Sequence, residues 1–311
     1  MLRMRLAEAA SEGHISFDHE VLRRLHAAGL PVPLPRPTGD GKSWVCDGER
    51  CYELLGWVTG CRFDRDDLQS IFQLGRFLAQ FHLAMIDSSP PGKEGALRED
   101  HPDLLRPYIG SIRELCSDSS ESGRLSELED ELDATQRDLD ESLYTRLPHS
   151  IIHGDIHPGN LRFHDSRVSA VYDFDYVSWQ SRARDLCDGL MFFAGFRPST
   201  LNPDDIWSLT QPFQLELHRS ILLLEGYKTL IVLDEGEWEA LPLLIRSRWI
   251  QMRLRGSRKV PRSERVRFVL EPFRPVIHWL DNLSAKFFEE LHEQICAPSP
   301  RSDRNSSRRS G

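Results

Sequence analysis

Residues 151–175 read IIHGDIHPGNLRFHDSRVSAVYDFD, and this stretch decides the predicted fold. Two apolar runs flank a short polar turn, which is the pattern of a β-hairpin. Folding the hairpin about Ser166 and Arg167 pairs residues whose numbers sum to 333, so Asn160 is expected opposite Asp173. Directly opposed residues of an antiparallel pair have Cα atoms about 4.5 to 5.5 Å apart. One divalent cation could therefore contact both side chains.

The residue types around this hairpin indicate a magnesium site with an acid group beside it. Mg²⁺ prefers hard oxygen ligands and keeps several waters, and Asn160 and Asp173 offer one amide and one carboxylate oxygen. Asp155 precedes Asn160 by five residues, in a loop that glycines and a proline keep from becoming a helix. A carboxylate held there could accept the proton of an attacking hydroxyl. The competing interpretation is that all three are turn residues, which their types also favour.

The spacing also resembles a known signature. His153-Gly154-Asp155, four residues, Asn160 and then Asp173-Phe174-Asp175 resemble the catalytic signature of the aminoglycoside phosphotransferase and choline kinase-like superfamily. Members of this superfamily are small-molecule kinases with a protein-kinase-like fold. Further likeness covers most of residues 1–295 and includes Asp185-Leu186, 74–82, 225–227 and 239–241.

In the central signature, the resemblance implies a role for each residue. It makes Asp155 the catalytic base and His153 a structural brace of the catalytic loop. Asn160 and Asp173 become the magnesium ligands, and Asp175 an auxiliary acidic group that helps to bind the cofactor. Outside the signature, it implies that Asp185 braces the loop through hydrogen bonds.

Near the N-terminus, the resemblance implies an ATP-binding small lobe. Arg3 is similar to the strand cation that contacts ATP phosphates, Glu20 to its ion-pair partner on the following helix, and 53–60 to the hinge that meets the adenine. The two strands and the glycine-containing turn that normally cover the phosphates should precede Arg3, and they are absent from this sequence. Either the start was assigned too far downstream or the small lobe is truncated. In the second case we expect weaker ATP binding.

The resemblance implies an α+β, two-lobed protein-kinase-like fold. We expect a small, apparently N-terminally truncated α/β nucleotide-binding lobe over 1–58, a mostly helical catalytic and acceptor-binding lobe over 59–297, and a disordered tail over 298–311. The expected elements are a helix over 17–29, a hairpin of 44–46 with 51–55, a loop leading into a surface helix over 117–141, and helices over 64–85, 214–233, 237–254 and 276–293.

Composition narrows the class of protein. The chain has 39 Lys plus Arg against 48 Asp plus Glu, a net charge of −9, which argues against a general nucleic-acid binder. Its apolar stretches are too short to span a bilayer and its start does not read as a secretory signal, so we expect a cytoplasmic protein without a membrane partner. The basic stretch 246–267 is interpreted as a solvated helix face followed by a basic loop. Six scattered cysteines predict neither a zinc site nor a disulfide framework.

Together these features predict an ATP- and Mg²⁺-dependent phosphotransferase that acts on a hydroxyl of a small molecule, such as an amino alcohol or an aminoglycoside. The rival hypothesis is a non-catalytic pseudokinase, a binding or regulatory module that lost nucleotide binding with its small-lobe strands. A metal-dependent hydrolase is a third possibility, but the sequence supplies no second metal cluster for it.

Overall fold

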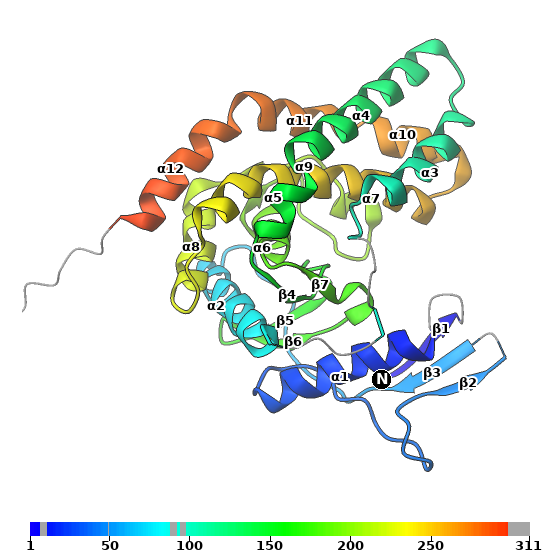
Figure 1. Ribbon diagram of the computed structural model, residues 1–311, viewed down its shortest axis with the longest axis vertical. Helices are drawn as coiled ribbons and strands as arrows, with labels where there is room; N and C mark the ends of the chain where they lie inside the picture. The colour runs from blue at the N-terminus through cyan, green and yellow to red at the C-terminus, as the bar shows by residue number, and fades with distance from the viewer. Residues whose placement is uncertain (7–10, 49, 88–91, 94–97, 298–311) are drawn as a thin grey trace, which may run out of the picture.

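The computed structural model describes residues 1–6, 11–48, 50–87, 92–93 and 98–297. It has a small lobe built on a three-stranded sheet and a larger, mainly helical lobe (Figure 1). The predicted disordered tail over 298–311 lies outside the described residues. In the part of the chain that the structure describes, none of the helices has the length and apolar character needed to cross a membrane.

The small lobe contains a helix and an antiparallel sheet with the strand order β1-β3-β2. The predicted hairpin is confirmed, and Gly48 takes a positive φ of 57° in its turn. The predicted helix is also confirmed, although it begins five residues earlier than expected, and Gly29 follows it at φ 83°. The elements are β1 (Leu2–Leu6), α1 (Glu12–Ala27), β2 (Val45–Asp47) and β3 (Arg50–Leu54).

Cys46 and Cys51 correct the prediction for the cysteines. They are directly opposed in the register of β2 and β3, and they form a disulfide. The expectation that the cysteines form no disulfide framework is therefore wrong for this pair, because the hairpin register places two cysteines without a recognisable spacing motif opposite each other. Cys187 is a buried free thiol, and Cys61 is an exposed one.

The large lobe begins with α2 (Leu68–Met85), which the apolar periodicity predicted. Two short antiparallel strand pairs, β4 with β7 and β5 with β6, lie between the small lobe and the helices (Figure 1). The remaining elements are α3 (Pro102–Arg113), α4 (Ser119–Asp138), α5 (Glu141–Arg146), β4 (His149–Ile152), β5 (Leu161–His164), β6 (Arg167–Val171), β7 (Ser178–Ser181), α6 (Ala183–Gly189), β8 (Gly195–Phe196), α7 (Ile206–Leu209), β9 (Gln214–Leu215), α8 (Leu217–Lys228), α9 (Glu235–Gly256), α10 (Arg265–Leu270), α11 (Phe273–Asn282) and α12 (Ser284–Cys296).

Two helix predictions need correction. The segment 117–141 was expected to start as a loop, but it is helical from Ser119, because Asp118 caps the first turn and leucines at helical spacing are buried along α4. The single helix expected over 276–293 is two helices that meet at Leu283.

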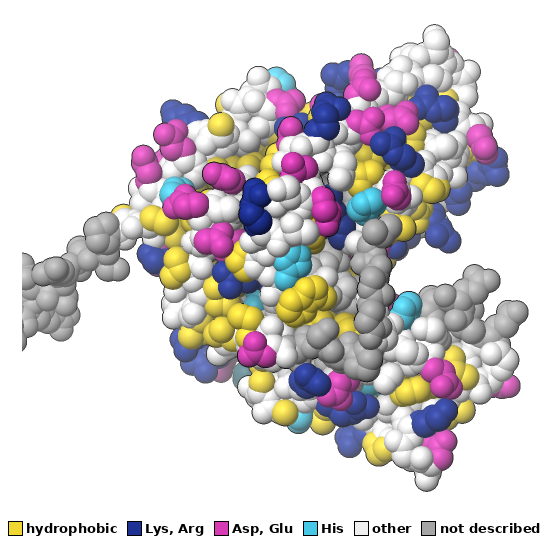
Figure 2. Space-filling model, in the orientation of Figure 1, with side chains coloured by type: hydrophobic (Ala, Val, Ile, Leu, Met, Phe, Trp, Pro, Cys, Tyr) yellow, Lys and Arg dark blue, Asp and Glu magenta, His cyan; other side chains and the backbone are white. Residues whose placement is uncertain are grey.

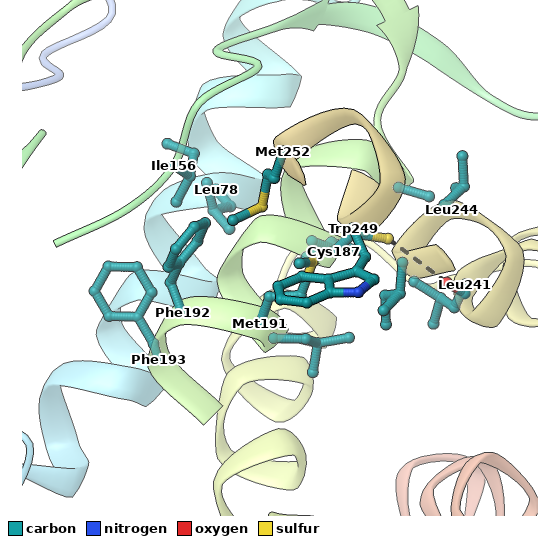
Figure 3. Packing of buried hydrophobic residues seen from close by; sticks show 14 of the residues in the cluster. Leu78, Ile156, Cys187, Met191, Phe192, Phe193, Leu241, Leu244, Trp249 and Met252 are labelled. Carbon is teal, nitrogen blue, oxygen red and sulfur yellow. Dashed lines mark hydrogen bonds between the residues drawn. The ribbon is translucent and has the colours of Figure 1, made fainter. Parts of the chain in front are cut away.

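The helix α9 organises the core of the large lobe. It contacts α3, α4, α6, α10, α11 and α12, and it is buried on most sides rather than along one stripe. Figure 3 shows its residues Leu241, Leu244 and Trp249 packed against Cys187 and Met191, which belong to α6 and to the short π-helical turn that follows it. This packing places the side chain of Arg248, on α9, beside the loop between β4 and β5.

The pair α2 and α8 packs unusually closely, and glycines make the approach possible. A Cβ atom added at Gly75 would lie 1.8 Å from the carbonyl oxygen of Leu223, and one added at Gly226 would lie 2.0 Å from that of Phe72. Both clashes are with backbone atoms, so a rotamer change cannot relieve them. Close contact of these helices fixes α2 against the centre of the lobe.

We predict that Gly75→Ala and Gly226→Ala each destabilise the protein by about 1–3 kcal/mol, the usual cost of overpacking. For a chain of this size, each kcal/mol lowers Tm by roughly 2–4 °C, which thermal unfolding followed by circular dichroism measures. Gly110→Ala and Gly123→Ala are matched controls, because both lie in helices and their added Cβ atoms meet nothing within 4 Å. Alanine has the higher helix propensity, so the controls should raise Tm. Equal effects in the two groups would contradict the packing account.

Candidate active site

The candidate site is built on the loop between β4 and β5, residues 153–160. Its start is held by Asp185 of α6, whose two carboxylate oxygens accept the backbone N–H groups of His153 and Gly154, both at 2.8 Å. Asp185 is fully buried and also contacts Nε2 of His82 at 3.3 Å. Burial alone would raise its pKa, but the hydrogen bond and charge of His82 outweigh burial and lower the pKa. The buried carboxylate is therefore ionised where it holds the loop.

His153 is also buried, and its ring contacts both the loop and the segment after β6. Its Nε2 lies 2.9 Å from the carbonyl oxygen of Tyr172, and its Nδ1 accepts the backbone N–H of Asp155 at 3.3 Å. The ring packs edge-on against Phe174, with centroids 5.0 Å apart. These contacts tie the loop to the segment after β6. Its role as a brace stays a prediction, which these contacts support.

Asn160 ends the loop with its side chain turned back toward Asp155. Its Nδ2 donates to the backbone oxygen of Asp155 at 3.0 Å and to the Asp155 carboxylate at 3.3 Å. Because the amide nitrogen is used in this way, Oδ1 of Asn160 is left as an acceptor. Within the described residues, no hydrogen bond to that oxygen is formed.

The register of the hairpin differs from the predicted one. The turn lies at Asp165 and Ser166, one residue earlier than expected, so His164 pairs with Arg167 and the pair sum there is 331. A β-bulge between Arg162 and Phe163 raises the sum to 332, so Leu161 pairs with Val171. Asn160 therefore lies opposite Tyr172, whose N–H donates to its carbonyl oxygen at 2.8 Å. The prediction that Asn160 directly opposes Asp173 is wrong.

Asp173 instead leaves the strand in a left-handed conformation, with φ 61° and ψ 71°. Left-handed backbone is uncommon for a residue other than glycine, although Asp tolerates it better than most. The turn starts the short 3₁₀ helix Phe174–Tyr176 and brings Asp173 and Asp175 close together. Burial, and then the negative charge of Asp175, raises the pKa of Asp173.

The two acidic groups receive Arg3 from β1 of the small lobe. Arg3 binds Asp173 at 3.0 Å, forms a closer ion pair with Asp175, and lies 3.5 Å from Glu53. Its guanidinium thus crosses between the lobes at the predicted metal ligands. Whether it contacts a nucleotide stays a prediction.

Glu20 does not form the expected ion pair with Arg3. Its carboxylate binds Arg23 and Arg24 on its own helix, each at 2.8 Å. The buried acid of α1 is Asp18, which pairs with Arg5 at 2.6 Å. A shift of two residues turns a helix by about 200°, so the residue that faces the sheet is on the opposite side from Glu20.

Asp155 has a charged partner that the sequence analysis missed. Nη2 of Arg248, on α9, donates to Oδ1 of Asp155 at 2.8 Å, and its Nε donates to Asp188 at 2.8 Å. Nε2 of His157 lies 3.5 Å from the other oxygen of Asp155. Burial would raise the pKa of Asp155, but His157 first, and then Arg248 and His153, hold it well below its usual range.

The basic stretch 246–267 is therefore not a uniformly solvated face. Arg248 and Arg253 are 7% and 0% exposed, so the prediction is wrong for both. A signal was present in the sequence, because Leu244 and Ile245 precede Arg248 by four and three residues, which puts them on the same helix face and predicts a buried environment for it.

Two cavities meet the loop from different sides. One, of about 550 Å³, is lined by Arg3, Glu53, Trp57 and Asp173, together with most of the predicted hinge. The other, of about 330 Å³, is lined by Asp155, together with His157, Tyr176, Arg248 and Arg255. Figure 2 shows the molecule hollowed on its right-hand side, between the small lobe below and the large lobe above.

The oxygen donors at the loop suit Mg²⁺. Oδ1 of Asn160 and the carboxylates of Asp173 and Asp175 are hard ligands, and Mg²⁺ commonly takes one or two protein carboxylates and completes its shell with phosphate and water. Within the described residues there is no group of three or more His, Cys, Asp or Glu side chains that could hold a metal by themselves. The site thus fits an ion that arrives with a phosphate ligand better than a preformed protein cage.

Comparison with known proteins relates the chain to characterised families. The homoserine kinase of Rhodospirillum rubrum is 29% identical over 235 residues, which is 75% of this chain and 65% of that protein. The homoserine kinase of Acidiphilium cryptum is 27% identical, over 75% of this chain and 66% of that protein. The chain thus spans slightly less than two thirds of the length of these relatives.

Solved structures show the same fold at low identity. The amicoumacin kinase hAmiN, in complex with AMP-PNP, Ca²⁺ and Ami, has a TM-score of 0.63 at 15% identity, covering 94% of this chain and 81% of that chain. A microcompartment-associated aminopropanol kinase has a TM-score of 0.64 at 18% identity, covering 93% and 87%. The α+β, two-lobed protein-kinase-like fold is confirmed.

A family model described as the phosphotransferase enzyme family matches residues 2–212, which include the small lobe, the loop 153–160 and α6. The match covers more than half of the chain and contains Asp155, Asn160, Asp173 and Asp185 in the order that the resemblance implied. The chain belongs to the phosphotransferase enzyme family.

Proposed function

We propose that this protein is a kinase that transfers the γ-phosphoryl group of ATP to a hydroxyl group of a small molecule, with Mg²⁺ as its metal. The observation that carries the proposal is the division of the site by one loop. Asp173 lines the cavity beside the predicted hinge, and Asp155 lines the cavity on the other side. A nucleotide in the first cavity and an acceptor in the second would meet at the loop.

In this proposal Asp155 orients the acceptor and receives its proton. The acceptor oxygen forms a bond to the γ-phosphorus while the bond from that phosphorus to the bridging oxygen of ADP breaks. The low pKa of Asp155 keeps the carboxylate ionised at neutral pH, so it serves as a fixed hydrogen-bond acceptor. A weak base of this kind takes the proton late, after most of the bond to phosphorus has formed.

Asn160 and Asp173 would hold the magnesium ion, with Asp175 beside them. The bound ion would neutralise charge on the phosphate oxygens. Arg3 contributes a second positive charge, and it would exchange part of its contact with Asp173 and Asp175 for the phosphates. Asp185 and His153 would position these groups by holding the loop in place.

The lining of the second cavity favours an acceptor with an anionic group. Arg255, Arg258 and Lys259 line it, and Asp155 is its one carboxylate among the described residues. A hydroxylated amino acid such as homoserine offers a carboxylate to these cations, whereas an amino alcohol or an aminoglycoside does not. We therefore rank homoserine-like acceptors above the amino alcohols and aminoglycosides.

A second candidate function rests on Arg3. Its guanidinium already binds both acidic groups that would approach the metal. A protein in which this ion pair replaced the metal permanently would be a pseudokinase, a module without nucleotide turnover. Binding and turnover measurements separate the two.

We predict that Asp155→Asn lowers the rate of ATP-dependent phosphorylation by about 100-fold or more, the usual size of a general acid–base contribution. The assay measures ADP release and phosphate-ester formation with homoserine, aminopropanol and aminoglycosides as acceptors. Asp165→Asn is the matched control, because Asp165 is exposed in the hairpin turn and asparagine tolerates its φ of 48°. Equal rates in wild type and Asp155→Asn would remove Asp155 from the mechanism.

We also predict that ATP with Mg²⁺ raises the Tm of the wild-type protein. A ligand at 100 times its Kd stabilises the folded state by about 2.7 kcal/mol. Asp173→Asn should lose the part of this shift that depends on Mg²⁺, while Asp165→Asn keeps it. No shift in the wild type at any concentration of ATP and Mg²⁺ would favour the pseudokinase.

The ion pair with Arg248 gives a prediction for pH dependence. The pKa of Asp155 lies well below its usual range, so protonation of Asp155 should cause no loss of kcat/KM as the pH falls from 8 to about 5. Arg248→Met removes one cause of the low pKa, so the pKa rises and activity should fall at a higher pH than in the wild type. Arg246→Met is the control, because Arg246 is on the same helix and pairs with Glu131 at 2.6 Å instead. Identical profiles in wild type and Arg248→Met would contradict the assignment.

A further inference from the structure

Arg197 is a buried cation that lacks an acidic partner. It follows β8 and is 7% exposed. Its Nε is buried without a hydrogen-bond partner, and its Nη1 makes a single long contact of 3.4 Å with the carbonyl oxygen of Gly195. No carboxylate among the described residues forms an ion pair with it. This state differs from that of Arg248, which has two carboxylate partners.

Two aromatic rings hold the Arg197 guanidinium in place. Its central carbon lies 5.3 Å from the ring centroid of Phe192 and 5.4 Å from that of Phe213. Contacts with aromatic faces orient a guanidinium, but they do not replace the water or counter-charge that it loses on burial. Burial, and then the nearby charge of Arg65, lowers its pKa to about 9, so it is still charged at neutral pH. An uncompensated charge of this kind is costly in a folded protein.

A cavity of about 810 Å³ lies in front of this side chain. Residues from the segment 62–66 before α2, the loop 153–160 and the segment 196–203 line it, among them Arg65 and Arg197. Nη1 of Arg65 donates to the carbonyl oxygen of Gly195 at 2.8 Å, so this one oxygen contacts both arginines. Arg65 also binds Glu216, which it shares with Arg219. The group thus has three arginines for one glutamate.

Acidic residues at the rim do not cancel this charge. Asp64 and Asp66 line the cavity and are exposed, so water and salt screen them, whereas Arg197 is buried and little screened. Arg62 is the third lining arginine, and it pairs with Asp204 at 2.6 Å. The strongest field inside the cavity is therefore that of Arg197.

Arg253 shows what a similar arginine looks like without a cavity. It is fully buried, it contacts the rings of Phe268 and Trp249, and its Nη1 donates to the carbonyl oxygen of Thr210 at 2.7 Å. Burial lowers its pKa to about 9 as well. Its Nε and Nη2 are buried without hydrogen-bond partners, as Nε of Arg197 is, but it lines none of the cavities described here. It therefore offers a matched control for Arg197.

We propose that the cavity at Arg197 is a second ligand site, which binds the carboxylate or phosphate group of a small molecule. Arg197 is its central cation and Arg65 the second one. A guanidinium suits such a group because its N–H donors form a rigid fork that matches two oxygens. The two Nη groups of Arg197 make only one long contact between them, so their remaining N–H donors are available to a ligand.

The site is placed to influence the reaction. Phe192 lines both this cavity and the cavity of Asp155, and Pro158 of the catalytic loop lines this cavity too. The ring of Phe192 also packs against His157, with centroids 5.7 Å apart. A ligand that draws Arg197 toward it would move a wall that the two cavities share. The anion site itself does not depend on the proposed kinase activity.

The test measures thermal stability with added inorganic phosphate or malonate, without ATP and Mg²⁺, against sodium chloride at the same ionic strength. Phosphate stands for a phosphorylated ligand and malonate for a carboxylated one, and the tighter of the two identifies the source. We expect a saturable rise in Tm for wild type. Arg197→Lys and Arg65→Gln should raise the apparent Kd by about tenfold or more, as expected for lost hydrogen bonds to a charged group.

Arg253→Lys is the control, which should lower Tm without changing the apparent Kd for the anion. Circular dichroism first establishes that each variant folds. If Arg197→Lys does not fold, Arg65→Gln still tests the proposal. The proposal is overturned if neither anion stabilises the wild type beyond the chloride control. It is also overturned if the variants bind as the wild type does, because the anion then occupies another cavity, such as the one at Arg3.

Discussion

One buried carboxylate, Asp185, determines the geometry on which the rest of the site depends. Its oxygens accept hydrogen bonds from the backbone N–H groups of His153 and Gly154. They also contact Nε2 of His82 in the core of the large lobe. An ionised carboxylate with two backbone donors is a strong and directional anchor. Because the loop starts at a fixed place, Asp155 and Asn160 can meet across it. If Asp185 lost a partner, its charge would be buried without compensation, which commonly costs 3–5 kcal/mol.

The second constraint is electrostatic. Asp155 would be a costly group to bury alone, and Arg248 compensates it while also binding Asp188, which Arg184 contacts at 3.1 Å. Buried pairs of this kind seldom add much net stability, because desolvation offsets their attraction. Their effect is on position and protonation. The ion pairs that link α6 to α9 hold Asp155 ionised and in the lining of the second cavity. Arg197 has no such partner, so its charge is available to a ligand.

Prediction from the sequence succeeded where local pattern decides the structure. The helix α2 follows from its apolar period, and the β2–β3 hairpin from the turn that contains Gly48. The errors concern contacts between distant or laterally shifted residues. The hairpin turns at Asp165 and Ser166 rather than at Ser166 and Arg167, and a β-bulge after Arg162 then shifts the register by one residue back toward the expected one.

The predictions for Glu20 and Arg248 were wrong for a different reason. The resemblance gave the helix α1 but not its rotation, so Glu20 was assigned to the face that meets the sheet. Asp18 occupies that face and pairs with Arg5, whereas Arg3 pairs with Glu53, Asp173 and Asp175. Arg248 was read as a surface charge, although its apolar neighbours indicate burial. The disulfide of Cys46 and Cys51 depends on cross-strand register, which becomes certain only when the hairpin is built.

The most direct test of the central claim is a crystal structure of the protein with a non-hydrolysable ATP analogue and Mn²⁺ in place of Mg²⁺, because anomalous scattering locates the ion. We expect one ion bound by Oδ1 of Asn160 and the carboxylate of Asp173, next to the terminal phosphate, with Arg3 moved toward the phosphates. An ion bound elsewhere, or an unchanged pair of Arg3 with Asp173 in the presence of the analogue, would contradict the account.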